Sequence, residues 1–427
     1  MLRNRSILGL IAAELVSLTG TAMTFVALPW FVLVTTGSTA KLGWVLAAQL
    51  LPVGLFGIPS GTLLARLGGK RTMLLSDAAR GPLMIVLPVL HWTGHLSFPA
   101  VLAIAFGVGC FSAPYFSSSR LVIPEVVGDD ERRVAEVGAV LAGANQITQI
   151  VGPVLAGVLI AVTSPSAVLV VDGGTYVFSF LTIATFVRAG KRVAATEESK
   201  GVLAGLRYLL HHPLLGPLLA VACVLNLIVE GLVVGINVLS YFHYSSAHVA
   251  GYLFGGFGAG AFVGALAAQQ LVRRYDLLKL AAGAILLMPL PLWLLPFSLP
   301  WPAVMVVLAA FAFSAPIVNA PVIAILTTRT PEALRPKVMT AVMTVASAAG
   351  PLGYLAAGEA LHYVSLRVVF VAIAAGLTVC ALAFAAVLRR GSSGSLRSRT
   401  ARRTFSLSRA GRSSASSTAP APGPELP

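Results

Sequence analysis

Long apolar segments follow one another along most of the chain, separated by short polar stretches. A membrane-spanning helix needs about 20 mostly apolar residues. The pattern therefore predicts an all-α integral membrane protein with about twelve transmembrane helices. The predicted spans are residues 7–35, 43–64, 72–90, 98–122, 134–163, 167–187, 214–241, 250–272, 277–295, 302–327, 338–363 and 368–388.

Composition agrees with lipid as the solvent. The chain is 57% hydrophobic and 11% charged, whereas soluble domains carry about 25% charged residues. The first apolar run is too long for the core of a secretory signal, about 7–15 residues, so we expect it to be retained as a helix. The cysteines Cys110, Cys223 and Cys380 lie in apolar runs without metal or redox spacing, and we expect no metal site.

Positive charges are distributed unevenly between the predicted loops. Of the 30 lysines and arginines, only Lys41 and Arg367 fall in loops on the outer side of this arrangement. Positive residues concentrate on the cytoplasmic side of membrane proteins. We therefore expect a multi-pass protein of the plasma (inner) membrane with both termini in the cytoplasm. The net charge of +15 follows this topology pattern and does not indicate nucleic-acid binding.

Short sequence matches indicate that the chain contains two similar halves. The first half holds Phe111-Ser-Ala-Pro114 and Gly152-Pro153, and the second holds Phe313-Ser-Ala-Pro316 and Gly350-Pro351 in the same order. Further matches pair 61–71 with 264–274 and 124–125 with 331–332. Such recurrence predicts a duplicated unit, and parallel repeats are known in transporters. The predicted regions are a six-helix half at 1–187, a cytoplasmic linker with an amphipathic helix at 188–213, a second six-helix half at 214–388, and a disordered basic cytoplasmic tail at 389–427.

The loop after the second predicted span carries a family resemblance. Residues 61–71 resemble the loop signature of the major facilitator superfamily, which combines glycines with a basic pair. Val16-Ser17, Thr36-Gly-Ser38, Asp77 with Arg80, and Asp172-Gly-Gly are similar to one branch, the macrolide-efflux and siderophore-exporter type of drug:proton antiporter. The resemblance covers about residues 7–388 and implies the major facilitator fold and proton-coupled export. The residues that we expect to form its cytoplasmic gate are Gly61, Arg66, Gly68, Lys70, Arg71, Asp77 and Arg80.

The chain departs from the family pattern in three places. Ala65 stands where the family loop has an aspartate, and this predicts a weaker gate. The fourth span lacks the family's arginine, since residues 102–114 contain no basic side chain. The antiporter signature of the fifth span is kept in part, as Gly143, Gly152-Pro153 and Gly157.

Acidic residues inside the predicted spans are the main candidates for chemistry. A charged group in a membrane is costly, and a carboxyl in a low-dielectric cavity can bind a proton that substrate or cation then displaces. Glu14 and Glu230 are therefore candidates for proton coupling or substrate binding, the alternative being a structural hydrogen bond or a wet helix end. Asp172 fits a gate or a binding site equally, and Asn226 lies one turn before Glu230. Asp77 and Arg80 can pair on one helix face in a structural or gating role.

Polar and helix-distorting residues in the fifth and eleventh spans complete the candidate set. Asn145, Gln146 and Gln149 share helical spacing and either join helices or line a cavity. A proline removes one helical hydrogen bond, so each Gly-Pro pair predicts a swivel at the interface between the halves, with simple packing as the alternative. The candidate swivel residues are Gly152, Pro153, Gly157, Gly350 and Pro351.

Secondary active export of an amphipathic or lipophilic small molecule, driven by protons, is the function that the sequence favours. The sequence holds no phosphate-binding loop or enzyme constellation, so we expect neither an enzyme nor a cofactor. The alternatives are an uptake symporter or facilitator of the same fold, and a non-transporting membrane sensor. The expected partners are a small-molecule substrate, protons and membrane lipids without nucleic acid, and the expected state is a monomer.

Overall fold

A computed structural model describes residues 5–128, 130–188 and 202–388, apart from the side chains of residues 57–66, 202–205, 333 and 336. Regular structure in this part of the chain is entirely helical, and twelve of its helices are long and apolar enough to cross a membrane. The predicted fold class and number of spans are therefore confirmed. The predicted basic tail and most of the polar linker lie outside the described residues.

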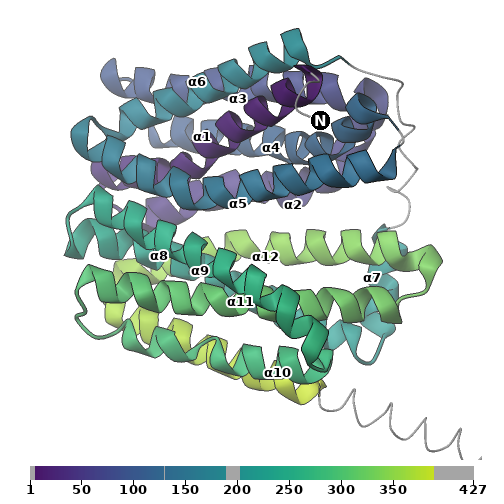
Figure 1. Ribbon diagram of the computed structural model, residues 1–427. Coiled ribbons are helices and arrows are strands. Elements are labelled where there is room, and N and C mark those ends of the chain that lie inside the picture. Colours follow the sequence, from purple (N-terminus) through teal and green to yellow (C-terminus); the bar gives the residue numbers. More distant parts are fainter. Residues whose placement is uncertain (1–4, 129, 189–201, 389–427) are drawn as a thin grey trace, which may run out of the picture.

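The first six helices form one packed group, drawn in purple and blue in Figure 1. Within it, α1 packs against α5 and α6, α2 packs against α4, and α3 packs against α4 and α6. The six are α1 Arg5–Thr36, α2 Thr39–Leu67, α3 Gly69–Trp92, α4 Phe98–Val127, α5 Glu131–Val162 and α6 Pro165–Phe186.

The remaining spans form a second group, drawn in green and yellow in Figure 1, in which α8 packs against α12 and α11 packs against α9 and α10. The helix that follows α12 spans Leu366–Leu388. The labelled elements are α7 Val202–His211, α8 Leu215–Val238, α9 Ala247–Arg274, α10 Leu277–Leu287, α11 Trp301–Arg329 and α12 Arg335–Tyr363.

Local chemistry explains where the helices depart from the predicted spans. Asp130 and Asp276 accept backbone N–H bonds at the first turns of α5 and α10, and such N-caps fix a helix start that hydropathy does not reveal. The ninth span is not one α-helix, because α10 ends at Leu287 and a 3₁₀ turn follows at Leu290–Leu294. Pro289 and Pro291 explain this change, since proline cannot donate a helical hydrogen bond.

The two groups meet along two helix pairs, α2 with α12 and α5 with α9. Glycines allow very close backbone approach in both pairs. A Cβ on Gly251 of α9 would lie 2.5 Å from the Pro153 carbonyl oxygen, and one on Gly43 of α2 would lie 2.5 Å from the Tyr354 carbonyl oxygen. Small residues at helix interfaces in membranes permit this packing. Each contact is matched by a glycine in the partner helix, Gly157 and Gly358 respectively.

Helix α7 lies beside the second group and packs against α8 and α12. The hydroxyl of Tyr208 donates a hydrogen bond of 3.2 Å to the Arg329 carbonyl oxygen at the end of α11. Leu209 is fully buried whereas Leu210 is 66% exposed. The helix is therefore attached to the bundle through the side that carries Leu209, and Leu210 faces away from it.

Candidate functional site

A cavity of about 300 Å³ lies between the two groups of helices. Its walls come from α1, α5, α8 and α9, and most of its lining side chains are apolar, including Phe25, Phe254 and Phe257. Glu230 is the one charged residue among the described residues that line it, and Gln146 and Gln149 supply amides from α5. An apolar cavity with a few convergent polar groups is typical of a small-molecule site.

Glu230 is half-buried on α8 and lines the cavity from that helix. The hydroxyl of Tyr354, a buried residue of α12, hydrogen-bonds its carboxylate. Gly350 of the same helix leaves room for this approach, since a Cβ there would lie 3.3 Å from Glu230 Cγ. The carboxylate is thus oriented by α12 and reaches the cavity from α8.

The structure brings only some of the predicted polar candidates to this cavity. Gln146 and Gln149 line it together with Glu230. Asn226 instead donates from Nδ2 to the Ala346 carbonyl oxygen at 3.0 Å and joins α8 to α12. Asn145 is not among the lining residues, and its carbonyl accepts a hydrogen bond from Thr148.

A second polar site is buried inside the first group of helices. Arg80 of α3 is 1% exposed, and its Nη2 donates to Asp77 Oδ1 at 2.6 Å. The guanidinium carbon lies 4.0 Å from the ring centroid of Tyr115 on α4 and 4.4 Å from that of Tyr176 on α6. Cation–π contacts of this kind stabilise a desolvated arginine by about 2 kcal/mol or more.

Two further carboxyl groups belong to this second site. Glu14 of α1 is 4% exposed and interacts electrostatically with Asp77 and Arg80. Asp172 of α6 is fully buried and accepts hydrogen bonds from Thr24 at 2.5 Å and Thr175 at 3.3 Å. We call Glu14, Asp77, Arg80, Tyr115, Asp172 and Tyr176 the buried charge cluster.

Hydrogen bonding in the buried charge cluster is incomplete. Over the described residues, seven buried side-chain atoms lack a hydrogen-bond partner. Most buried polar atoms in proteins are paired, so a local concentration of unpaired ones requires an explanation. Six of the seven are in or beside the cluster: Glu14 Oε1, Ser17 Oγ, Asp77 Oδ2, Arg80 Nε, Tyr115 OH and Ser179 Oγ.

The predicted gate residues do not form one unit in this structure. Asp77 and Arg80 pair as expected, but deep inside the helix group and away from the loop basic residues. Lys70 Nζ donates to the Ala184 carbonyl oxygen at 3.2 Å, and Arg71 is exposed. Gly68 adopts a φ of 80° at the start of α3, a conformation that favours glycine. Gly61 lies within α2, and the Arg66 side chain is outside the described part.

Glu125 takes a role at this loop that the sequence did not assign to it. Its Oε1 accepts a hydrogen bond of 3.0 Å from the Gly69 backbone N–H, the first residue of α3. A carboxylate at a helix N-terminus satisfies a free donor and complements the helix dipole. The repeat of Pro124-Glu125 as Pro331-Glu332 was the only available signal.

The candidate swivel residues lie where helices approach closely. A Cβ on Gly152 would lie 2.5 Å from Ala22 Cβ of α1, and Gly157 faces Gly251 across the two halves. Pro153 lines the cavity, and Gly350 lies between α2 and α8. Pro351 is buried within a continuous α12. These positions agree with close packing, and whether they also swivel stays a prediction.

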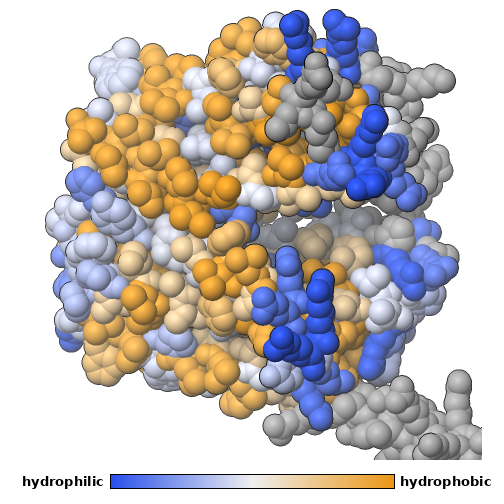
Figure 2. Space-filling view, in the orientation of Figure 1, coloured by the Kyte–Doolittle hydropathy of each residue, from blue (hydrophilic) through white to orange (hydrophobic). Residues whose placement is uncertain are grey.

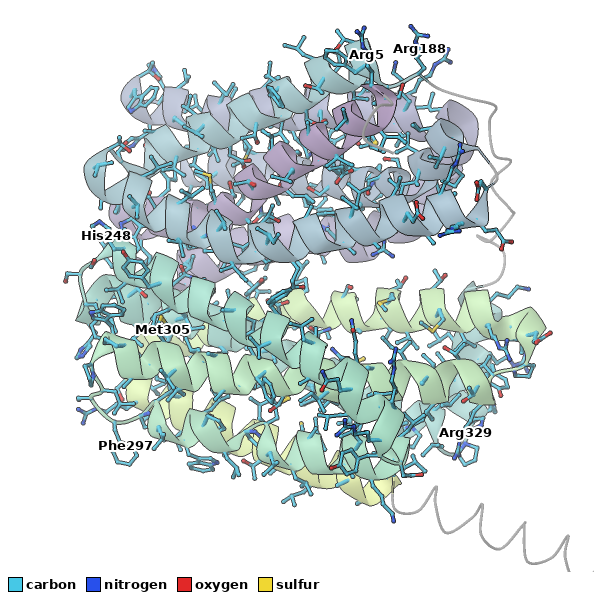
Figure 3. The ribbon with its side chains drawn as sticks, in the orientation of Figure 1. Arg5, Arg188, His248, Phe297, Met305 and Arg329 are labelled. Carbon is cyan, nitrogen blue, oxygen red and sulfur yellow. The ribbon has the colours of Figure 1, made fainter. Side chains whose placement is uncertain are left out.

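The two ends of the bundle differ. Figure 3 places Arg5, Arg188 and Arg329 at one end, here called the basic end, and His248 and Phe297 at the other. Figure 2 shows a hollow between the two groups of helices at the basic end. At the other end the Trp44 indole donates to Glu359 Oε1 at 3.1 Å across the halves, beside the contact between Gly43 and Gly358. The structure is therefore closed at the end opposite the basic one.

Two packed groups of membrane-spanning helices with a cavity between them are an arrangement known from membrane transporters. The chain belongs to the Major Facilitator Superfamily, whose family model matches residues 10–353 and 245–420. This confirms the family resemblance of the sequence.

Characterised relatives and solved structures agree with this membership. The chain is 26% identical over 377 residues to the multidrug efflux pump Tap of Mycolicibacterium fortuitum, covering 84% of this chain and 90% of the relative. It is 25% identical to the pump of the same name from Mycobacterium tuberculosis (strain ATCC 25618 / H37Rv), covering 85% and 88%. The crystal structure of nucleoside transporter NupG superposes with a TM-score of 0.75 at 13% identity, covering 89% of this chain and 98% of that one.

Proposed function

We propose that the protein exports amphipathic or lipophilic small molecules in exchange for protons. The observation that carries this proposal is the cavity between the halves, which is apolar apart from Glu230, Gln146 and Gln149. Such a surface suits a ligand that is mostly hydrophobic with one polar or cationic group. The similarity to pumps named for multidrug efflux supports the same class of substrate.

Alternating access is the transport mechanism that we propose. The contacts of Gly43 with Gly358 and of Gly157 with Gly251 hold one end of the molecule closed while the basic end is hollow. Rocking one half against the other around the cavity would exchange the open and closed ends. The two pairs of interface helices occupy related positions in the two halves, which suits such a rigid-body motion.

Proton coupling is assigned to the buried acids. Glu14 sits in a dry environment with one oxygen unpaired, and Glu230 lies in the cavity where substrate would bind. A carboxyl that binds a proton when its surroundings are apolar, and releases it when substrate or water enters, can couple the two fluxes. Asp172 is a weaker candidate, because two threonine hydroxyls already satisfy its carboxylate.

Reconstituted vesicles with an imposed pH gradient and a lipophilic cationic dye test the proposal. Wild-type protein should accumulate dye against its concentration gradient. Glu14→Gln and Glu230→Gln, which mimic the protonated carboxyl, should abolish accumulation. Glu136→Gln is a matched control, because Glu136 forms an exposed pair with Arg132. If neither Glu14→Gln nor Glu230→Gln alters gradient-driven flux, the coupling assignment is wrong. Wild-type flux that ignores the gradient would favour a facilitator.

The plasma (inner) membrane, with both termini in the cytoplasm, is the proposed location. Reporter fusions after Arg188 and after Leu388 should both report the cytoplasm, because the basic end carries most of the positive charge. A periplasmic signal from either fusion would contradict this orientation.

A further inference from the structure

Arg80 is contacted by residues of several helices, more than an ion pair with Asp77 requires. Its pair with Asp77 joins two residues of the same helix, one turn apart, and so holds no two helices together. The guanidinium is instead fixed between helices by the rings of Tyr115 on α4 and Tyr176 on α6. Tyr176 is itself oriented by a hydrogen bond of 3.0 Å between its hydroxyl and that of Thr21 on α1. Four helices therefore determine the position of this one cation.

The charges around Arg80 do not balance when every acid is ionised. Glu14, Asp77 and Asp172 face a single cation, with Tyr115 and Tyr176 as the other titratable groups of the cluster. Uncompensated carboxylates in a low-dielectric interior are strongly destabilising. Asp77 is neutralised by Arg80, and Asp172 is solvated by Thr24 and Thr175. Glu14 has less compensation than either, since Ser119 supplies its one side-chain hydrogen bond and its Oε1 has no partner among the described residues.

Arg80 also has donor capacity left over. A guanidinium carries five N–H donors, and Nε of Arg80 is buried without a partner. Arg80 can therefore bind a second carboxylate in addition to Asp77. Glu14, an acid of the same cluster, needs a compensating cation when it is ionised.

We propose that Arg80 is the positioning residue for proton release from Glu14. With Glu14 protonated, Arg80 pairs with Asp77 alone, as in this structure. When the Glu14 O–H bond breaks, the proton leaves to water that enters from the basic end, and the new carboxylate is compensated by Arg80, whose Nε–H is unpaired. The rings of Tyr115 and Tyr176 keep the guanidinium in place during this exchange. This inference rests on the proposed proton antiport.

The position of Arg80 also bears on the fourth span. Residues 102–114 of α4 contain no basic side chain. Through its contact with Tyr115, Arg80 of α3 nevertheless places a buried positive charge against α4. The half therefore has a fixed internal cation where α3, α4 and α6 meet.

The test separates coupling from folding by two transport assays on the full chain in vesicles. One measures uphill dye accumulation driven by a pH gradient, and the other measures exchange of labelled for unlabelled dye at equal pH, which needs no net proton movement. Arg80→Gln should lower uphill accumulation at least about ten-fold more than exchange, because Glu14 loses its counter-charge. Tyr115→Leu should also lower uphill accumulation more than exchange, but by a smaller factor. Only one of the two aromatic rings that contact the guanidinium is removed. Arg132→Gln, at a position 90% exposed, is the control.

A purely structural role gives different outcomes. If the pair of Arg80 and Asp77 only neutralises buried charge, the double variant Asp77→Asn/Arg80→Gln should regain uphill accumulation, and this recovery would overturn the proposal. The proposal would also be overturned if uphill accumulation and exchange fell by the same factor in Arg80→Gln and in Tyr115→Leu. Continued loss of uphill transport in the double variant supports it.

An optical measurement keeps this inference distinguishable from the proposed function. Infrared difference spectra recorded against pH should contain a carboxyl C=O band that disappears in Glu14→Gln, and its pH midpoint should move in Arg80→Gln. An unmoved midpoint refutes the link between Arg80 and Glu14. A moved midpoint in a protein whose wild type ignores the pH gradient would support the link and reject only antiport.

Discussion

Of the residues in the candidate sites, the acids could be found from the sequence and the tyrosines could not. Glu14, Asp172 and Glu230 were recognisable because acids are rare inside apolar segments, and the structure buries the first two and places the third at the cavity. Tyr115, Tyr176 and Tyr354 gave no such signal. An aromatic ring in a membrane helix looks the same in sequence whether it faces lipid or an arginine, and only the packing of α4, α6 and α12 decides between them.

Tyr354 provides a prediction at this scale. Tyr354→Phe removes the hydroxyl that orients the Glu230 carboxylate and leaves the ring in place. A hydrogen bond contributes about 0.5–1.5 kcal/mol net, so the KM for a cationic dye should rise about two- to ten-fold with little change in kcat. The concentration dependence of dye export measures both constants. Tyr363→Phe, at an 80% exposed position, is the control, and an unchanged KM in Tyr354→Phe would exclude Glu230 as a dye contact.

The sequence predicted the location of the membrane-spanning helices well. It predicted their exact termini and their packing partners less well. Hydropathy located all twelve spans, because lipid requires about 20 apolar residues whatever the tertiary structure. It missed the cap at Asp130 and the 3₁₀ turn after Leu287, which depend on single polar residues and prolines. The sequence predicted a swivel at Gly152-Pro153 and left close packing as the alternative, because a glycine followed by a proline is compatible with both roles.

The glycine contacts between α5 and α9 lead to a prediction at the scale of elements. Gly251→Ala places a Cβ 2.5 Å from the Pro153 carbonyl oxygen, on backbone that cannot move aside cheaply. Overpacking of this kind costs about 1–3 kcal/mol, so the unfolding midpoint in detergent should fall and transport should slow. Gly283→Ala is the matched change, since a Cβ on Gly283 meets nothing within 4 Å. Equal midpoints for the two variants would show that the close contact is not maintained in the membrane protein.

Which end of the molecule is open cannot be predicted from any single segment of the sequence. Duplicated motifs indicate two similar halves, but a given sequence is compatible with opening at either end, because rigid-body rocking leaves every helix and its internal contacts intact. The hollow at the basic end and the closure at the other depend on contacts between residues far apart in the sequence, such as Trp44 with Glu359.

The closed end supplies the last prediction. Trp44 and Glu359 hydrogen-bond across the halves, so alternating access requires them to separate in every cycle. A Trp44→Cys/Glu359→Cys pair, in a chain whose three native cysteines are replaced by serine, should be joined by a short bifunctional methanethiosulfonate reagent and stop export, because the end opposite the basic one can no longer open. Reduction of the cross-link should restore export. Each single cysteine variant, treated with the same reagent, should keep its activity and so controls for modification without cross-linking. Gel mobility after protease cleavage in the linker between the halves measures the extent of cross-linking. Export that continues at full rate when cross-linking is complete would mean that this end does not open, and the substrate would then require another route out of the cavity beside Glu230.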